Sequence, residues 1–190
     1  MTRILGISGS LRRGSYNTAL LRAGAPLLEA GAELEIALLH GIPPYDGDLE
    51  AAEGLPLSVR DLKARVIACD GLLLATPEYN NGVPGVFKNA IDWLSRPISD
   101  IPRVFGHRPV GVIGASPSGF GTILAQDAWL PVLRTLRMCP YFGARVMVSH
   151  AAKVFNEAGE LVDEIVRGQL RDYLRGFVRF IQAGFLGPAR

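Results

Sequence analysis

The chain has 190 residues, of which 48% are hydrophobic and 20% are charged, and its formal net charge is +2. These values exclude a disordered protein and suffice for the core of one globular domain, which we expect to span residues 1–190. The small net charge and the lack of a basic run argue against a nucleic-acid-binding protein. Cys69 and Cys139 match no metal-ligand spacing, and we expect both to be buried and reduced; the alternative is a disulfide or a redox role.

The first part of the chain alternates strand, helix, strand and loop. Residues 4–8 are an apolar run typical of a short buried strand, and residues 17–30 form a helical pattern that Pro26 should kink or shorten. The second strand is predicted at residues 34–39. Residues 40–56 contain three prolines and three glycines, which argues against regular structure in this segment.

The remaining elements continue this alternation. Ser58 is placed to cap the next helix, and the apolar run at residues 72–75 is expected of a strand that is covered on both faces. Helices are predicted at residues 58–68, 86–94, 122–138 and 161–183, and strands at residues 72–75, 109–115 and 144–149. Five strands that alternate with helices form a βαβ series, which builds a parallel α/β sheet with right-handed crossovers and helices on both faces.

Three polar loops leave the carboxyl ends of predicted strands. They are loop 1 (residues 8–18, SGSLRRGSYNT), loop 2 (residues 76–85, TPEYNNGVPG) and loop 3 (residues 116–122, SPSGFGT). In parallel sheets of this kind, ligands bind beyond the carboxyl ends of the strands, where the winding direction reverses. We therefore expect the three loops to converge on one binding site.

Loop 1 carries the donors that suit a phosphate. The helix after it offers unpaired N–H groups and the positive end of its dipole, and the loop adds hydroxyl, amide and guanidinium groups from Ser8, Ser10, Arg12, Arg13, Ser15, Asn17 and Thr18. The G-x-G-x-x-G spacing of dinucleotide sites and the Gly-Lys-Ser/Thr of P-loops are both missing. The competing interpretation is a polar turn in which Ser15 or Asn17 only caps the helix.

Loop 2 has the composition of a rigid turn. Pro77 and Pro84 stiffen it, while Gly82 and Gly85 allow close approach of the backbone to a ligand. Its N–H groups can meet the polar edge of a flat heterocycle, and Tyr79 can lie against the face of that ring. The alternative for Tyr79 is a surface aromatic at a loop tip. Small residues in loop 3 leave space beside the same edge, unless that loop is only a flexible Gly-Ser turn.

The motifs GSLRRGSYNTALL, TPEYNNGVPGVFKNAIDWLSRP and GASPSGFGT, in this order, resemble the NADPH-dependent FMN reductase family. The resemblance covers nearly the whole chain. It implies a flavodoxin-like three-layer sandwich, with a five-stranded parallel sheet of order 2-1-3-4-5 and helices on both faces. It also implies an FMN-dependent NAD(P)H oxidoreductase, which passes hydride from a nicotinamide through bound FMN to quinone, azo, metal-ion (chromate) or flavin acceptors.

The resemblance also implies the residues of the cofactor site. The FMN phosphate would be held by Ser10, Arg12, Ser15, Asn17 and Thr18. The isoalloxazine would be lined, mainly through backbone groups, by Pro77, Glu78, Tyr79 and Asn80, and bordered by Ser116 and Gly119. No catalytic side chain and no metal ligand is implied, because the flavin carries the redox chemistry.

Family members are commonly homodimers or homotetramers, with the flavin near an interface built partly from the helices after loops 2 and 3. No nucleic-acid or membrane partner is expected, and the lack of a signal peptide or of an apolar segment of ~20 residues predicts a cytoplasmic protein. The alternatives are a non-catalytic FMN-binding protein and a flavodoxin-type electron carrier, although such carriers are typically strongly acidic. Pro117 and Phe120 make loop 3 differ from the version typical of quinone and chromate reductases, so the acceptor is left open, as is the choice between NADPH and NADH.

Overall fold

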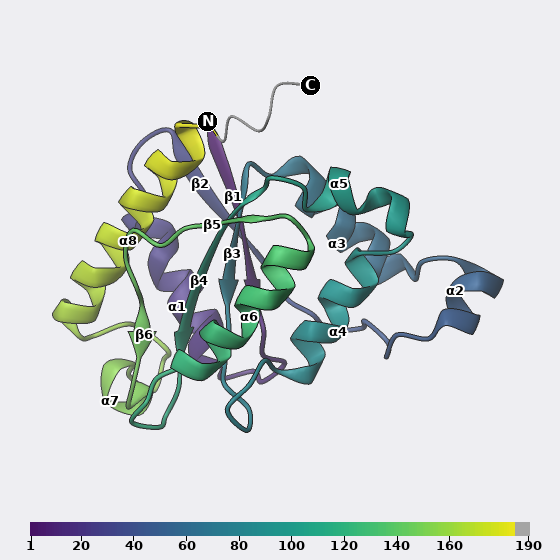
Figure 1. Ribbon diagram of the computed structural model, residues 1–190. Helices are drawn as coiled ribbons and strands as arrows, with labels where there is room; N and C mark the ends of the chain where they lie inside the picture. Colours follow the sequence, from purple (N-terminus) through teal and green to yellow (C-terminus); the bar gives the residue numbers. More distant parts are fainter. Residues whose placement is uncertain (185–190) are drawn as a thin grey trace.

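A parallel sheet of apolar strands forms the middle layer of the protein, in a computed structural model that describes residues 1–184 (Figure 1). Its strands are β1 (Thr2–Ser8), β2 (Ala32–Ala37), β3 (Gly71–Ala75), β4 (Pro109–Ala115), β5 (Cys139–Pro140) and β6 (Met147–Val148). The strand order is β2-β1-β3-β4-β5, and β6 pairs with β4 beyond the end of β5. All these pairs are parallel, so the predicted flavodoxin-like order is confirmed.

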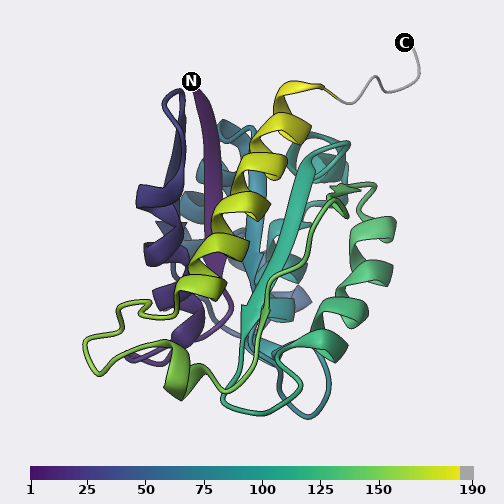
Figure 2. The ribbon, with the colours of Figure 1, turned by 90° about the vertical axis from the view of Figure 1, so that its left-hand side faces the viewer.

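Helices cover both faces of this sheet (Figures 1 and 2). One face carries α1 (Tyr16–Gly24), α7 (Ala151–Val154) and α8 (Glu164–Gln182). The other carries α3 (Leu57–Ala68), α4 (Gly85–Leu94), α5 (Ile101–Val104) and α6 (Ile123–Thr135). The short elements that complete the fold are η1 (Ala25–Leu27), α2 (Gly47–Glu53) and η2 (Ile98–Asp100).

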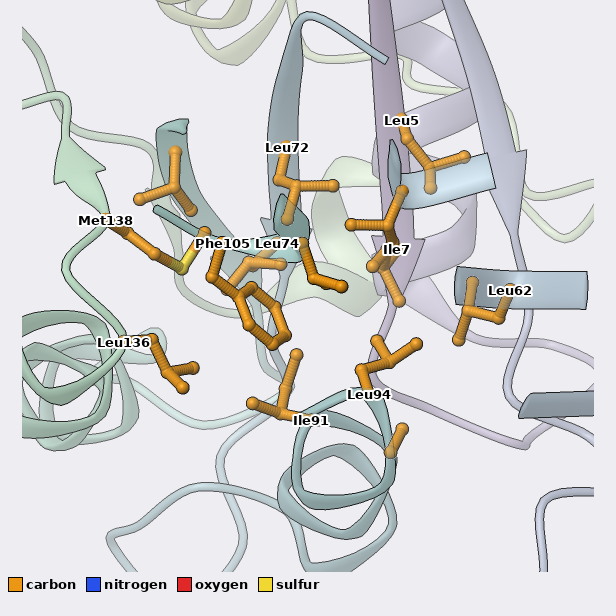
Figure 3. Close-up of a cluster of buried hydrophobic side chains, with 14 of the residues drawn as sticks. Leu5, Ile7, Leu62, Leu72, Leu74, Ile91, Leu94, Phe105, Leu136 and Met138 are labelled. Carbon is orange, nitrogen blue, oxygen red and sulfur yellow. The ribbon is translucent and has the colours of Figure 1, made fainter. Parts of the chain in front are cut away.

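The core is divided by the sheet into two clusters, because successive side chains of a strand point to opposite faces. In β3, Leu72 and Leu74 join the cluster under α3, α4 and α6, which Figure 3 shows, whereas Leu73 and Ala75 join the cluster under α1 and α8. All five residues of β3 are buried. This strand therefore explains why the sequence at residues 72–75 is apolar throughout and not alternating.

The predicted fifth strand, residues 144–149, is wrong in its extent. Two short strands, β5 and β6, occupy that edge of the sheet instead, and the chain between them leaves the ladder. In the segment between these two strands, the ring of Tyr141 packs against Tyr173 and Phe177, with ring centroids 5.2 and 5.8 Å apart. The first predicted helix, residues 17–30, ends early at Gly24, and Pro26 lies in the 3₁₀ turn that follows. The expected shortening of this helix at Pro26 is thus confirmed.

The segment 40–56 is not devoid of regular structure, as its prolines and glycines had suggested, because it contains α2. Asp46 caps this helix by accepting hydrogen bonds from the N–H groups of Asp48 (2.9 Å) and Leu49 (3.4 Å). The prediction that Ser58 caps α3 is also wrong. Its hydroxyl donates to the carbonyl of Gly41 instead, at 2.9 Å.

The two cysteines, the membrane-spanning potential and the extent of the domain were also predicted from the sequence. Cys69 and Cys139 are free and buried, and burial raises the pKa of both thiols. Within residues 1–184, no helix combines the length and the apolar character needed to cross a membrane. The last six residues of the predicted domain, 185–190, lie outside the described part of the chain.

Candidate functional site

A cavity of about 390 Å³ lies at the carboxyl ends of β1, β3 and β4, where the three loops gather at the lower edge of the sheet in Figure 1. It is lined by Ser10, Arg12, Ser15, Tyr16 and Asn17 of loop 1, by Pro77, Glu78, Tyr79, Asn80 and Asn81 of loop 2, and by Ala115, Ser116, Pro117 and Ser118 at loop 3. The convergence of the loops follows from the parallel sheet, which places these strand ends at one edge.

The structure brings all the predicted site residues to this cavity except Thr18 and Gly119. Thr18 is buried behind the loop, where its N–H donates to Ser15 Oγ (3.2 Å) and its hydroxyl contacts Ser8 Oγ (2.7 Å). Gly119 faces away, since a Cβ atom built on it would lie 3.4 Å from the imidazole of His150. The lining residues that sequence reasoning missed are neighbours of the chosen ones in the same loops: Tyr16, Asn81, Ala115, Pro117 and Ser118.

Loop 1 presents hydroxyl protons to the cavity. Ser10 Oγ accepts from the N–H of Arg12 (3.3 Å), and Ser15 Oγ accepts from the N–H of Thr18 (3.2 Å). A hydroxyl that already accepts from the backbone keeps its own proton to donate. Both serines are buried, and the first N–H groups of α1 open beside them. Together these groups form a site for an anion.

Arg12 adds positive charge to this anion site. Its side chain is exposed at the edge of the cavity, and none of the ion pairs found within residues 1–184 involves its guanidinium. A guanidinium without a carboxylate partner is able to bind a phosphate through two of its donors.

Loop 2 turns back on itself as a tight hairpin. The N–H of Tyr79 donates to the carbonyl of Gly82 (3.2 Å), and the N–H of Gly82 donates to that of Tyr79 (3.1 Å). Asn80 and Asn81, between them, have φ values of 50° and 61°. Two positive φ angles define the type I′ turn, and asparagine tolerates them better than other side chains with a Cβ. The Tyr79 N–H is thus used within the hairpin, and the tip N–H groups of Asn80 and Asn81 take no part in it.

Loop 3 is held on its outer side by the turn between β6 and α7. The N–H of His150 donates to the carbonyl of Ser118 (2.9 Å), and the N–H of Ala151 donates to that of Ser116 (3.0 Å). The two serine hydroxyls lie 2.9 Å apart, and Ser116 Oγ also accepts from the N–H of Ser118. This pairing keeps both serines at the cavity.

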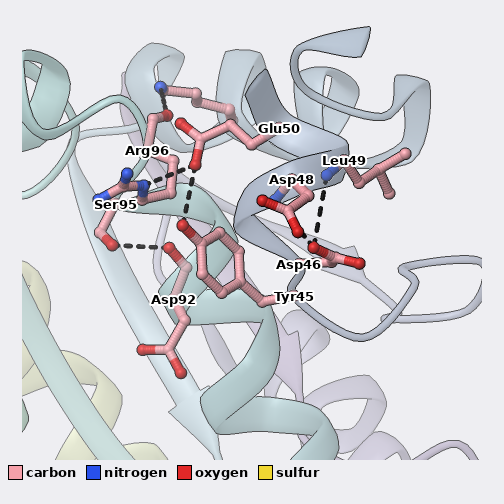
Figure 4. Close-up of polar contacts among 9 residues, drawn as sticks. Tyr45, Asp46, Asp48, Leu49, Glu50, Asp92, Ser95 and Arg96 are labelled. Carbon is pink, nitrogen blue, oxygen red and sulfur yellow. Dashed lines mark hydrogen bonds and ion pairs between the residues drawn. The ribbon is translucent and has the colours of Figure 1, made fainter. Parts of the chain in front are cut away.

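The segment 40–56 is attached to the outer side of α4 (Figures 1 and 4). None of its residues lines the cavity. Trp93 Nε1 donates to the carbonyl of Pro43 (2.8 Å), and Glu50 accepts from Tyr45 Oη (2.9 Å) and Arg96 Nε (2.8 Å). The hydrogen bond from Arg96 lowers the pKa of Glu50 and raises that of Arg96. These contacts fix the segment beside α4.

The residues of the cavity fit FMN. Its volume lies in the range of small-molecule sites, and the hydroxyls, the guanidinium and the α1 N-terminus match a terminal phosphate with three exposed oxygens. Loop 2 adds the ring of Tyr79, which is 45% exposed, and the hairpin tip, both suited to a flat heterocycle. Residues 1–184 contain no cluster of three or more His, Cys, Asp or Glu side chains that could hold a metal ion.

Comparison with known proteins agrees with this fit. The family of the NADPH-dependent FMN reductases matches residues 2–153. An NAD(P)H-dependent FMN reductase of Pseudomonas aeruginosa is 39% identical over 180 residues, which cover 95% of each chain. A quinone reductase of Escherichia coli K12 is 32% identical over 185 residues, again 95% of each. The structure of FerB, a flavoenzyme NAD(P)H:(acceptor) oxidoreductase from Paracoccus denitrificans, superimposes with a TM-score of 0.84 at 33% identity, covering 97% of this chain and 99% of that one.

The matched segment, residues 2–153, contains all three loops of the cavity. The predicted family, enzyme class and cofactor are thereby confirmed, whereas the roles of the individual site residues stay predictions. This chain belongs to the NADPH-dependent FMN reductase family, an oxidoreductase family that works with FMN and NAD(P)H.

Proposed function

We propose that the cavity binds FMN with its phosphate on loop 1 and its ring against loop 2, and that the protein reduces quinone-type acceptors. The observation that carries this proposal is the pair of buried hydroxyls, Ser10 and Ser15, beside the N-terminus of α1. When bound, FMN supplies the chemistry: it takes hydride from the nicotinamide and passes the electrons to the acceptor. The protein residues bind and orient it.

Each part of the cavity has a role in this proposal. Ser10 and Ser15 donate to phosphate oxygens, and Arg12 neutralises the phosphate charge. Asn17 contributes its N–H at the start of α1, and Thr18 supports Ser15 from behind. At the ring, Pro77, Glu78 and Asn80 offer backbone groups, Tyr79 offers its ring, and Ser116 borders the opposite edge.

The class of acceptor is proposed from the relatives. Relatives named for quinones include the quinone reductase of Escherichia coli and a 2-hydroxy-1,4-benzoquinone reductase of Burkholderia sp, both 32% identical to this chain. We place the protein in the cytoplasm, where NAD(P)H is available to it as the reductant. The two buried cysteines are free, which agrees with a reducing compartment.

An absorbance spectrum of the purified protein tests the proposal. We expect the protein to take up FMN, the flavin band to bleach on anaerobic addition of NADPH or NADH, and the band to return on addition of benzoquinone. A protein that takes up no FMN would contradict the site. A bound flavin that no nicotinamide bleaches would favour the electron carrier or the non-catalytic binding protein.

We also propose that the protein is a homodimer or homotetramer that associates through loop 3 and α6. Apolar side chains gather there beside the cavity: Phe120 is 80% exposed, and Ile123 and Leu124 are each 44% exposed. Clustered exposed apolar side chains are typical of an interface.

Light scattering should therefore give a mass above 20.5 kDa for the wild type and a lower mass for Phe120→Ser. Ile165→Ser, on α8 and 75% exposed, is the control and should keep the wild-type mass; a monomeric wild type would contradict the proposal.

A further inference from the structure

Glu78 lines the cavity, but its carboxylate is directed at a helix of the protein. Glu78 Oε2 accepts from the N–H groups of Leu124 (2.9 Å) and Ala125 (3.0 Å), the second and third residues of α6. The side chain of Thr122, the residue at the N-cap of α6, makes no capping hydrogen bond; its buried hydroxyl oxygen accepts from Gln126 Nε2 instead, at 3.1 Å. Glu78 therefore caps α6 from loop 2, where its charge also interacts favourably with the helix dipole.

Asn17 is used in a comparable way at the other end of loop 3. Its Nδ2 donates to the carbonyl of Ala115 (2.9 Å), and its Oδ1 accepts from the N–H of the same residue (2.9 Å). Asn17 is only 3% exposed. Its side-chain amide thus pairs with the last residue of β4 as a neighbouring strand would, and this pairing uses both of its polar atoms.

These two contacts lie at the two ends of loop 3. Asn17, from loop 1, holds Ala115 just before it, and Glu78, from loop 2, holds the first turn of α6 just after it. We propose that Glu78 and Asn17 are positioning residues, whose side chains fix loop 3 relative to loops 1 and 2 and do not bind FMN. This inference rests on the proposed function, in which FMN touches all three loops at once.

The proposal predicts a specific pattern of flavin affinities. A side chain that holds the loops affects FMN and riboflavin equally, since both use the ring site, whereas a phosphate ligand affects FMN alone. Glu78→Ala and Asn17→Ala should each raise the Kd of both flavins by about tenfold, the loss expected for one or two hydrogen bonds of this kind. The ratio of the two Kd values should stay at its wild-type value.

Conservative variants of Glu78 show whether flavin affinity depends on the length of this side chain or on its charge. Glu78→Gln keeps an acceptor oxygen at the same distance from α6, so its flavin Kd values should stay within about threefold of the wild type. Glu78→Asp keeps the charge but is one methylene shorter, so it should behave like Glu78→Ala.

Asp163→Ala is the matched control. Asp163 caps α8 by accepting from the N–H of Val166 (2.9 Å), and it does not line the cavity. Its loss should lower the melting temperature without changing either Kd.

Flavin titrations and melting curves of these variants test whether Glu78 and Asn17 are positioning residues. Wild-type binding of FMN is measured first, since its failure would remove the proposed function and not only this inference. If Glu78→Ala lowers the melting temperature but leaves both Kd values unchanged, as in Asp163→Ala, Glu78 is only a helix cap and the proposal is wrong. If Asn17→Ala weakens FMN alone, the Asn17 side chain is a phosphate ligand and the proposal is also wrong. Asn17→Ser, which is too short to bind both atoms of Ala115, replaces Asn17→Ala if that variant does not fold.

Discussion

Gly9→Ala is expected to destabilise the protein by about 2–3 kcal/mol and to weaken FMN binding strongly. A Cβ atom on Gly9 would lie 2.2 Å from Cδ1 and 2.9 Å from Cε1 of Phe87, and 3.0 Å from Cδ of Pro77. Phe87 has little freedom to move away. It is fully buried, and its ring meets that of Trp129 edge-on, with centroids 4.9 Å apart and planes at 72°. The backbone of loop 1 must therefore shift, and Ser10 shifts with it.

Thermal unfolding of the apoprotein and FMN titration measure this effect. A loss of this size should lower the melting temperature by about 5–10 °C in a chain of this length. Gly14→Ala is the matched control, since Gly14 lies in the same loop but has no heavy atom within 4 Å of the added Cβ. The control should keep the wild-type melting temperature and Kd. Gly9→Ala with wild-type values for both would show that loop 1 does not rest on Phe87.

A second substitution identifies the clash as the cause. Phe87→Ala removes the ring atoms that the new Cβ would meet, so Gly9→Ala combined with Phe87→Ala should be more stable than the sum of the two single effects allows. Strictly additive losses would point to backbone flexibility at Gly9, and not to contact with Phe87, as the origin of the destabilisation.

The location of the site was predictable from the sequence, because it depends on topology alone. Strands and helices alternate along the chain, which requires parallel strands, and parallel strands place loops 1, 2 and 3 at one edge of the sheet. Loop composition then distinguished a phosphate site from a dinucleotide or P-loop site. The family resemblance supplied the strand order and the flavin, neither of which follows from periodicity.

The roles of individual side chains were less predictable, because their partners are distant in sequence. Asn17 looked like a phosphate ligand, yet its amide binds Ala115, 98 positions away. Glu78 was expected to line the ring mainly through its backbone, and that expectation left open its carboxylate, which binds backbone N–H groups 46 and 47 positions away. A sequence pattern shows that a polar group is present, but the contact that uses this group is decided by the packing of the loops.

The errors in secondary structure have a similar origin. Prolines and glycines in residues 40–56 concealed α2, although Asp46 is a good N-cap and marks its start. The edge strand was predicted as one run because its residues favour extended structure. In the structure only β6 lies within that run and β5 precedes it; Tyr141, between the two strands, packs on Tyr173 of a helix near the end of the chain. Local propensity carries no information about such a contact.

Ser15→Ala is expected to raise the Kd for FMN by about ten- to a hundredfold while changing the Kd for riboflavin little. In the proposed complex the Ser15 hydroxyl donates to the charged phosphate, and a hydrogen bond to a charged group contributes about 1.5–3 kcal/mol. Because Ser15 is 5% exposed, water cannot readily take its place. Riboflavin lacks the phosphate and so loses nothing at this position.

Ser15 has a second role, which the same experiment must separate from the first. Its Oγ caps α1 by accepting from the N–H of Thr18, and loss of a cap lowers stability by about 1 kcal/mol in alanine variants but by only a few tenths in glycine variants. Ser15→Gly should therefore bind FMN as weakly as Ser15→Ala but melt closer to the wild type. Ser58→Ala, which removes a hydroxyl bonded to Gly41 away from the cavity, should leave both flavin Kd values unchanged. An equal loss of affinity for FMN and riboflavin in Ser15→Ala would mean that the phosphate lies elsewhere, because only a phosphate contact distinguishes the two flavins.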